Sequence, residues 1–193
     1  ECIEQLKHKN PDFEHHLFDD KDCEEFIERH FNSDVVKAYR SLKPGAYKAD
    51  LWRYCVLYVQ GGFYIDIKFC TTRPLADFCG QRECFVVDRD RIGVYNALMG
   101  VMPKNKRMKQ CIDAIVRNVD NRFYGLSPLD PTGPRLLRKC FTDREYKKLP
   151  LIQTTQYCQK HGQQTQIRTR WLYKAIAESY RNYRDEQKKF TSI

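Results

Sequence analysis

The clearest pattern of hydrophobic and polar positions lies in residues 47–69. Apolar residues at positions 47, 51, 54, 55 and 58 follow the spacing of one helix face, and they predict a helix that ends at Gly61 and Gly62. From residue 63 the pattern becomes an alternation with a period of two, which predicts a strand over 63–69. One face of this strand is apolar, and the other carries Tyr64, Asp66 and Lys68. The second face is therefore the place to look for chemistry.

Shorter patterns predict the remaining elements. We expect helices over 1–9, 21–31, 104–121 and 171–188, a short helix from Pro134 to about 141, and strands over 13–18, 84–87, 94–102, 150–157 and 164–168. Residues 10–12 are expected to form a turn, and residues 88–91 and 130–134 are expected to form loops. Asp19 or Asp20 is a suitable N-cap for the helix over 21–31. Helices that alternate with strands predict an α/β domain.

The length of 193 residues predicts a single domain over 1–193. Its composition excludes collagen-like and wholly disordered chains, and no window of eighteen uncharged apolar residues is present to cross a membrane. The sequence begins at Glu1 without a methionine, inside a predicted helix. We therefore expect a chain trimmed at both ends, whose targeting segment or anchor lies outside it.

The net charge of +9 is unevenly distributed. Residues 1–34 contain 4 Lys and Arg against 11 Asp and Glu, whereas the remainder contains 30 against 14. The basic part suits an anionic partner, which can be a nucleic acid, a nucleotide diphosphate or an acidic surface. A basic surface that only keeps the protein soluble explains the same charge equally well.

The nine cysteines are an odd number, so they cannot all pair within the chain. No Cys-x-x-Cys motif occurs, and the histidines show no ligand spacing, so we expect no zinc site and no site built from histidine. Cys55 and Cys111 lie on apolar helix faces and are expected to be small buried residues. This usage slightly favours a reducing compartment, and the location stays open between the cytoplasm and the lumen of the Golgi or endoplasmic reticulum.

Three charged residues form a candidate site. Asp50 and Arg53 are three positions apart on the predicted helix, so they project together, and Asp66 follows the Gly-Gly break on the polar face of the next strand. Ligands of open α/β sheets bind where strands end, because the loops diverge there. A cross-strand salt bridge on an exposed strand face would use the same residue types. These residues alone do not decide between the two interpretations.

The wider motif resembles glycosyltransferase family 32, whose sugar-binding region contains a DXD motif. The matching segments are Ala49-Asp50-Leu51-Trp52-Arg53-Tyr54, Leu57-Tyr58, Gly61-Gly62-Phe63-Tyr64-Ile65-Asp66, Arg73-Pro74-Leu75, Asn10-Pro11-Asp12-Phe13, Phe18-Asp19-Asp20, Asn96 to Gly100, and Thr132-Gly133-Pro134. Several independent spacings agree over about residues 1–140. The chain is similar to this family throughout that range.

The resemblance implies a GT-A fold, a Rossmann-like mixed sheet flanked by helices. It also implies a hexosyltransferase that moves a hexose from a UDP-sugar or GDP-sugar, with retention of configuration, to an acceptor on a glycan, a protein or a lipid. The donor half would be about 1–100, and the acceptor side about 101–193. No nucleic acid is expected as a partner, and a membrane is expected only through segments outside this chain.

The resemblance also implies roles for individual residues. Asp66 matches the first aspartate of the DXD motif, which faces the sugar or ribose and a Mn²⁺ or Mg²⁺ ion, and Asp50 and Arg53 match the pair that reaches the sugar hydroxyls. We expect Asp66 and Arg53 to be catalytic and Asp66 to be the metal ligand. The donor site would also include Tyr64, Lys68 and Asn96, and the acceptor side would include Thr132 and Gly133.

Simpler interpretations stand beside several of these roles. Asn96 can equally form hydrogen bonds with backbone groups at the end of a strand, and Thr132 and Gly133 can belong to an ordinary turn. Three tyrosines of the last predicted helix either stack on an acceptor sugar or pack in the core: Tyr173, Tyr180 and Tyr183.

Lys68 stands where the family has its second aspartate. Either the lysine supplies the positive charge that a metal would bring to the leaving diphosphate, or Asp66 still shares a weakened metal site with the donor phosphates. Because of this substitution, a binding protein without activity is the alternative to an enzyme. It would be either a degenerate module that only binds carbohydrate or nucleotide, or a basic protein that binds nucleic acid.

Overall fold

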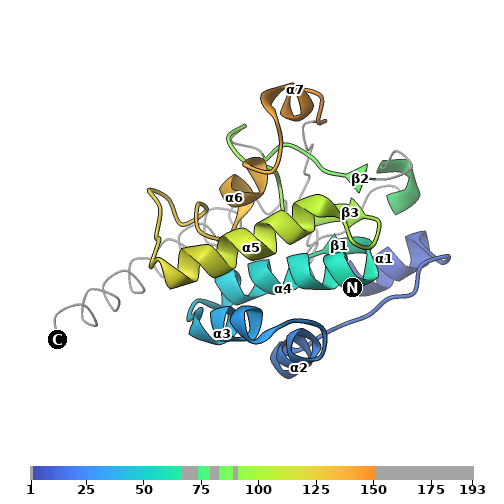
Figure 1. Ribbon diagram of the computed structural model, residues 1–193. Coiled ribbons are helices and arrows are strands. Elements are labelled where there is room, and N and C mark those ends of the chain that lie inside the picture. The colour runs from blue at the N-terminus through green and yellow to red at the C-terminus, as the bar shows by residue number, and fades with distance from the viewer. Residues whose placement is uncertain (1, 67–73, 79–82, 89–90, 151–193) are drawn as a thin grey trace, which may run out of the picture.

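A computed structural model describes residues 2–66, 74–78, 83–88 and 91–150 (Figure 1). Its helices are α1 (Cys2–Lys9), α2 (Asp20–His30), α3 (Ser33–Ser41), α4 (Gly45–Gln60), α5 (Lys106–Asp120), α6 (Pro134–Arg138) and α7 (Asp143–Tyr146), with one 3-10 turn at Leu75–Phe78. Its strands are β1 (Gly62–Ile65), β2 (Glu83–Cys84) and β3 (Leu98–Val101). The α/β class predicted from the sequence is confirmed.

The three strands form a sheet in the order β1-β3-β2. Both pairs are antiparallel, with Phe63 opposite Gly100 in one pair and Cys84 opposite Gly100 in the other. An isolated bridge between Val87 and Val94 continues the contact beyond β2. The parallel pairing that a mixed sheet also requires does not occur among these described strands.

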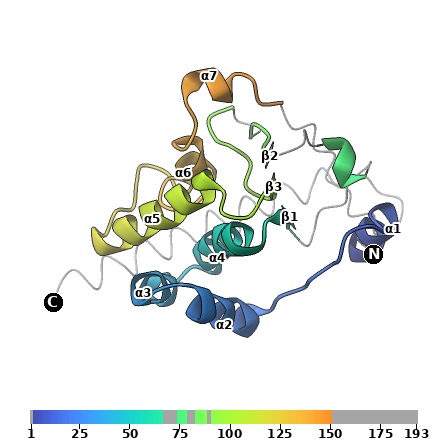
Figure 2. The same ribbon diagram turned by 45° about the vertical axis from the view of Figure 1, so that its right-hand side comes forward.

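Helix α4 lies at the centre of the molecule and contacts α2, α3, α5 and β1. All but its two ends are buried, because its sequence is apolar around most of its circumference. Figures 1 and 2 show α4 and α5 side by side, and α3 contacts both of them, while α2 contacts α3 and α4. The sheet continues from the C-terminal end of α4, so residues of this helix face the strands that follow it.

The predicted break after α4 is confirmed. Gly61 and Gly62 have φ angles of 69° and 83°, which glycine adopts without steric cost. At Gly61 a Cβ atom would also lie 2.6 Å from Cδ of Pro103 and 2.9 Å from the carbonyl oxygen of Val101. The chain therefore needs glycine here to turn from α4 into β1 and pass close to the end of β3.

Side-chain caps explain where two other helices begin. Asp19 accepts a hydrogen bond from the backbone N–H of Asp22, whose own carboxylate accepts from Asp19 N–H, so the predicted cap is confirmed. Asn105 caps α5 by accepting from the N–H groups of Arg107 and Met108. The apolar stripe predicted for α5 packs into the core.

The strand predicted over 13–18 is wrong. This segment is irregular, and side-chain packing holds it instead of a hydrogen-bonded ladder. The ring of Phe13 lies 5.4 Å from Phe63, and the ring of Phe18 lies 4.9 Å from Trp52, centroid to centroid.

Three further differences concern element bounds. The strand predicted over 94–102 is shortened to Leu98–Val101, because the chain turns at Asn96 and Ala97 and directs the Asn96 amide toward α4. The strand predicted over 84–87 is shorter too, with β2 at Glu83–Cys84. Helices α3 and α7 were not predicted, although Asn32 and Thr142 are ordinary N-caps.

Several predictions lie outside the described residues. They are Lys68 and the end of the strand over 63–69, the strands over 150–157 and 164–168, the helix over 171–188, and Tyr173, Tyr180 and Tyr183.

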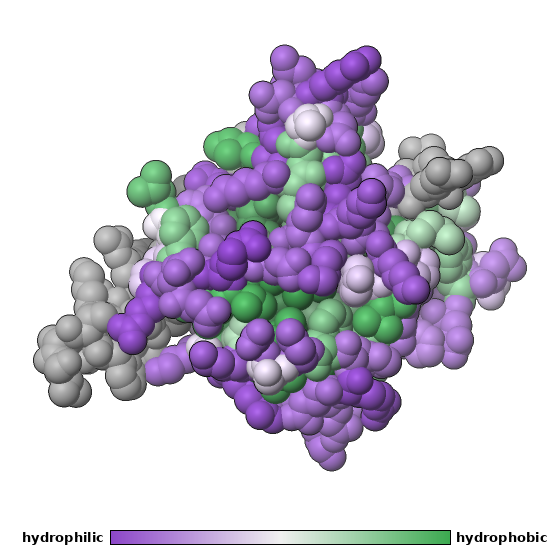
Figure 3. All heavy atoms as spheres, viewed as in Figure 1, coloured by the Kyte–Doolittle hydropathy of each residue, from purple (hydrophilic) through white to green (hydrophobic). Residues whose placement is uncertain are grey.

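The face of the molecule seen in Figure 3 is mostly hydrophilic. Its hydrophobic residues gather in a band at α4, between α5 and the α2–α3 pair. Within the part of the chain that the structure describes, no helix is long and apolar enough to span a bilayer.

Candidate functional site

The predicted pair on α4 faces the strands as expected. Asp50 and Arg53 are buried, and so is Tyr54, whose side chain lies beside them. The turn before β3 brings Asn96 to the same place, and the loop before α6 brings Thr132. Segments that are far apart in the sequence thus converge on one polar cluster.

Asp50 is held by donors on both carboxylate oxygens. Its Oδ1 accepts from Nδ2 of Asn96 at 2.9 Å and lies 3.3 Å from Nη2 of Arg53, while its Oδ2 accepts from Oγ1 of Thr132 at 2.7 Å. Tyr54 joins Thr132 to the same group, because its hydroxyl donates to the carbonyl oxygen of Thr132 at 3.1 Å. Each of these partners of Asp50 is a donor, which is the pattern of an ionised carboxylate.

Arg53 connects the two carboxylates of the site. Besides the contact with Asp50, its Nη1 lies 3.4 Å from Oδ1 of Asp66 and donates to the carbonyl oxygen of Asn96 at 2.8 Å. The guanidinium also stacks over the ring of Tyr64, with Cζ 4.6 Å from the ring centroid. The planar fork of arginine is thus used in full.

Asp66 follows β1 directly, and its backbone N–H donates to the carbonyl oxygen of Ala97 beside β3. The Tyr64 hydroxyl donates to Oδ1 of Asp66 at 2.8 Å. Exposure separates the three charged side chains, since 23% of Asp66 is accessible against 13% of Asp50 and 7% of Arg53. Asp66 is therefore the carboxylate of this cluster that a ligand reaches most easily.

Burial is the largest influence on the pKa values of Asp50, Arg53 and Tyr64. Desolvation raises the pKa of Asp50, against the opposing effects of Arg53, Thr132 and Asn96. Burial alone would lower the pKa of Arg53, but the neighbouring Asp50 raises it on balance, so the guanidinium stays charged. Burial also raises the pKa of the Tyr64 phenol, which therefore remains a donor at neutral pH.

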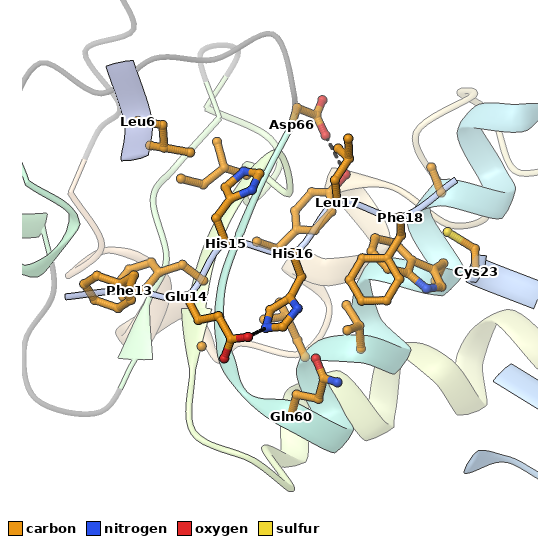
Figure 4. Close-up of a pocket in the computed structure, with 18 of the residues that line it drawn as sticks. Leu6, Phe13, Glu14, His15, His16, Leu17, Phe18, Cys23, Gln60 and Asp66 are labelled. Atoms are coloured by element: carbon orange, nitrogen blue, oxygen red, sulfur yellow. Dashed lines mark hydrogen bonds and ion pairs between the residues drawn. The ribbon is translucent and has the colours of Figure 1, made fainter. Parts of the chain in front are cut away.

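A pocket of about 700 Å³ opens on Asp66 (Figure 4). β1 runs along it from the end of α4 near Gln60, and the segment with His15 and His16 crosses it. Its aromatic walls include Phe18, Trp52 and Tyr64. Tyr64 and Asp66 thus belong both to the pocket and to the polar cluster behind it.

The structure brings together most of the residues that the sequence singled out. They are Asp50, Arg53, Tyr64, Asp66, Asn96, Thr132 and Gly133. Asn96 lies in the turn before β3 and donates to Asp50, and its contact with a sugar or acceptor stays a prediction. Thr132 and Gly133 lie against Asp50 rather than apart from it, with a Cβ built on Gly133 3.5 Å from Oδ2.

Tyr54 was missed as a site residue, although it stands beside Arg53 in the motif. Its hydroxyl accepts from Asn96 at 3.3 Å, donates to Thr132, and is fully buried. The aromatic residue directly after Arg53 was assigned only to the apolar face of the helix.

The described residues fit a divalent ion only in part. None of their His, Cys, Asp and Glu side chains gather in groups of three or more that would hold a metal. Oδ1 of Asp66 already contacts Tyr64 and Arg53, so this carboxylate alone offers few ligand atoms to an ion. It fits an ion that also takes ligands from a diphosphate, because Mg²⁺ is commonly bound by one or two carboxylates together with phosphates.

Comparison with known proteins shows similarity to glycosyltransferases. Residues 1–86 match the family described as the glycosyltransferase sugar-binding region containing a DXD motif. The initiation-specific alpha-1,6-mannosyltransferase of Candida albicans is 35% identical over 88 residues, which are 45% of this chain and 23% of the relative. The inositol phosphoceramide mannosyltransferase 3 of Schizosaccharomyces pombe is 28% identical over 142 residues, 73% of this chain and 39% of the relative.

A glycosyltransferase of Acanthamoeba polyphaga mimivirus is 29% identical over 140 residues, 72% of this chain and 55% of that protein. The chain thus spans less than two thirds of each of these relatives. Among solved structures, the PaToxG glycosyltransferase is similar with a TM-score of 0.50 and 17% identity, over 70% of this chain and 59% of that one. This likeness shows the fold, and it agrees with the glycosyltransferase fold implied by the sequence.

The family match ends just beyond β2, so it contains α4, β1 and the charged and phenolic groups around Arg53, which are Asp50, Tyr54, Tyr64 and Asp66. Asn96 and Thr132 lie beyond it and within the longer alignments of 140 and 142 residues. Through residues 1–86 the chain is therefore similar to glycosyltransferase family 32, the family whose sugar-binding region contains the DXD motif.

Proposed function

We propose that this chain transfers a hexose from a UDP-sugar or GDP-sugar to a hydroxyl group of a glycan, protein or lipid acceptor, with retention of configuration. The observation that carries the proposal is the Asp66 carboxylate, which borders the pocket while Arg53 and Tyr64 fix its position. A pocket of about 700 Å³ with aromatic walls lies within the range of small-molecule sites, about 300–1,000 Å³.

Mannose is the hexose that the comparisons favour. Two of the relatives are mannosyltransferases by name, and one of these names specifies a lipid acceptor, inositol phosphoceramide. Carboxylates and guanidinium groups are suitable partners for sugar hydroxyls, because they accept and donate directed hydrogen bonds. GDP-mannose is therefore the first donor to test, and UDP-sugars follow.

The reaction breaks the bond between the sugar C1 atom and a diphosphate oxygen, and forms a bond between C1 and an acceptor oxygen. In a front-face reaction the acceptor proton passes to the departing phosphate oxygen, so no enzyme nucleophile is required. Asp66 would orient the sugar or ribose, and Arg53 would keep Asp66 in place while its positive charge faces the developing negative charge.

Asp50 has a positioning part in this proposal. Its carboxylate is committed to Asn96, Thr132 and Arg53, so it holds the guanidinium against β1 and the 132–133 loop against α4. Its remaining accessible edge allows contact with a sugar hydroxyl. Thr132 and Gly133, expected on the acceptor side, would then connect acceptor binding to the donor carboxylates.

Replacing Asp66 with asparagine tests the proposal. Asp66→Asn keeps the side-chain shape but removes the charge, and we expect turnover of the donor to fall about 100-fold or more with the fold intact. Release of nucleoside diphosphate from GDP-mannose and UDP-sugars, in water and with acceptor, is the measurement. Asp34→Asn, an exposed change on α3 away from the site, is the matched control. Wild-type turnover in Asp66→Asn contradicts the proposal.

The metal requirement depends on Lys68, which lies outside the described residues. We propose that Asp66 shares Mn²⁺ or Mg²⁺ with the donor diphosphate, where the ion would neutralise the charge of the leaving group. Lys68→Asp should then tighten Mn²⁺ binding in the presence of nucleoside diphosphate, as measured by titration. Full wild-type activity in EDTA that Lys68→Asp abolishes would instead make the lysine the replacement for the metal.

A binding module without activity is the second candidate, because Lys68 replaces the second aspartate of the motif. Such a module would bind GDP-mannose or a UDP-sugar in a thermal-shift assay and leave it unhydrolysed. A protein that binds nucleic acid would ignore both donors and retain DNA with a steep dependence on salt.

A further inference from the structure

Two cysteines from separate elements lie in contact behind the polar cluster. Cys111 is fully buried on α5, and Cys140 is half-buried just after α6. Their sulfur atoms are 3.5 Å apart. Figure 1 shows α6 against α5, and contacts between these helices fix the two backbones in this arrangement.

We propose that Cys111 and Cys140 are a redox-active pair that a hydroperoxide oxidises to an intramolecular disulfide. The sulfur atoms need to approach by only about 1.5 Å to reach the bonded distance of about 2.05 Å. This inference concerns a covalent modification, and it does not depend on the transferase activity proposed above.

The surroundings shift the pKa values of the two thiols in opposite directions. The hydrogen bond from Cys111 and the charge of Arg107 lower the pKa of Cys140, although burial opposes them. Burial raises the pKa of Cys111, which therefore stays a thiol and donates to the Cys140 sulfur. Cys140 is also the more accessible of the two, so it is the thiolate that meets the oxidant, and Cys111 is the thiol that completes the disulfide.

Arg107 holds Cys140 in this environment. Its Nη1 donates to the carbonyl oxygen of Cys140 at 2.6 Å, its Nη2 donates to Glu145 at 2.8 Å, and its guanidinium lies over the ring of Phe141 with Cζ 4.1 Å from the centroid. The segment after α6 is thus tied to the first turn of α5. A guanidinium fixed in this way favours the thiolate throughout the folded state.

The chemistry balances in two steps. The Cys140 thiolate attacks the terminal OH oxygen of the hydroperoxide, the O–O bond breaks, and hydroxide leaves, or alkoxide where the oxidant is an alkyl hydroperoxide, so Cys140 becomes a sulfenic acid and the peroxide is reduced. The Cys111 sulfur then attacks the Cys140 sulfur, the S–O bond breaks, and water leaves with the Cys111 proton. Two thiols and one hydroperoxide thus give one disulfide, one water from the second step and, after protonation of the first leaving group, a second water or an alcohol.

The bond would enclose the loop that carries Thr132. The two cysteines are 29 residues apart in the sequence, and the segment between them contains Thr132 and Gly133 beside Asp50. A covalent link at the ends of this segment lowers the conformational freedom of the unfolded chain. Oxidation should therefore raise the melting temperature of the protein, by about 5 °C or more.

Oxidation of the reduced, folded chain with hydrogen peroxide tests the proposal. We expect the intact mass to fall by two hydrogen atoms, a 111–140 linked peptide after digestion, and recovery of both thiols with dithiothreitol. In Cys111→Ala, the sulfenic acid on Cys140 should persist and be trapped by dimedone. Cys140→Ser, at a half-buried site that tolerates the change, should abolish both products.

Cys23→Ser is the matched control, because Cys23 is a buried cysteine of α2 whose pKa burial raises to about 12. It should form the 111–140 disulfide as the wild type does. A disulfide between other members of the nine cysteines, or full oxidation of Cys140 to sulfinic acid without the linked peptide, would overturn the proposal. So would a 111–140 pair that stays reduced while other thiols of the chain react.

Discussion

The hydroxyl group of Thr132 offers the sharpest test of the polar cluster. Thr132 is 1% exposed, and its Oγ1 donates to Oδ2 of Asp50 at 2.7 Å. Thr132→Val replaces the hydroxyl with a methyl group of nearly the same shape, so the packing is kept while a buried carboxylate oxygen loses its donor. A hydrogen bond to a charged group contributes about 1.5–3 kcal/mol, which is the expected loss in the free energy of unfolding.

Thr132→Ser is the matched variant, because it keeps the hydroxyl and removes only the methyl group. Burial of one methyl group contributes about 0.8 kcal/mol, and some cavity cost is added. We therefore expect the valine variant to be the less stable of the two. For a chain of this length, the loss expected for the valine variant corresponds to a fall of about 3–12 °C in melting temperature.

Urea denaturation of wild type, Thr132→Val and Thr132→Ser measures these differences directly. A double-mutant cycle with Asp50→Asn isolates the pair, because the valine change should cost about 1 kcal/mol less once the carboxylate is neutral. A Thr132→Val protein as stable as the wild type, or more stable than Thr132→Ser, would refute the view that this hydroxyl holds Asp50.

Two further variants test the neighbouring contacts. Arg53→Lys removes the planar guanidinium that contacts Asp50, Asp66 and the Asn96 carbonyl oxygen, so donor affinity measured by calorimetry should fall about tenfold or more. An unchanged affinity would mean that these residues form only a structural ion pair. Gly100→Ala places a Cβ 2.7 Å from Cε1 of Phe63 and 3.0 Å from Cβ of Cys84, and it should lower the free energy of unfolding by about 1–3 kcal/mol in urea; an unchanged midpoint would mean that the sheet relaxes around β3.

The local periodicity of the sequence was sufficient to predict the helix and the strand that carry the site. The helical spacing from residue 47, the two glycines and the alternation after them placed α4, its end and the first part of β1 correctly. These signals are strong because each depends on neighbouring residues only. The pair Asp50 and Arg53 could be placed on one helix face for the same reason.

Long-range contacts explain what the sequence did not predict. The segment over 13–18 was predicted to be a strand, yet packing of Phe18 on Trp52 holds it rather than a ladder. The sequence around Thr132 is typical of a turn. Its hydroxyl contacts Asp50, which is 82 positions earlier in the sequence, only in the folded chain. No local pattern records such a contact. The motif resemblance was the only sequence signal that joined Thr132 to the site.

The charges of the cluster set a condition on any diphosphate donor. Asp50 and Asp66 flank the single guanidinium of Arg53, so these three side chains together carry one net negative charge. A diphosphate brought to Asp66 adds more negative charge, and two like unit charges 4 Å apart repel by about 4 kcal/mol at an effective dielectric constant of 20. Productive binding therefore requires a further cation beside Asp66. The two cations proposed above for this place are a divalent ion shared with the phosphates and the Lys68 ammonium group. The Mn²⁺ titration of wild type and Lys68→Asp distinguishes them, while the need for a cation follows from the geometry of Asp50, Arg53 and Asp66.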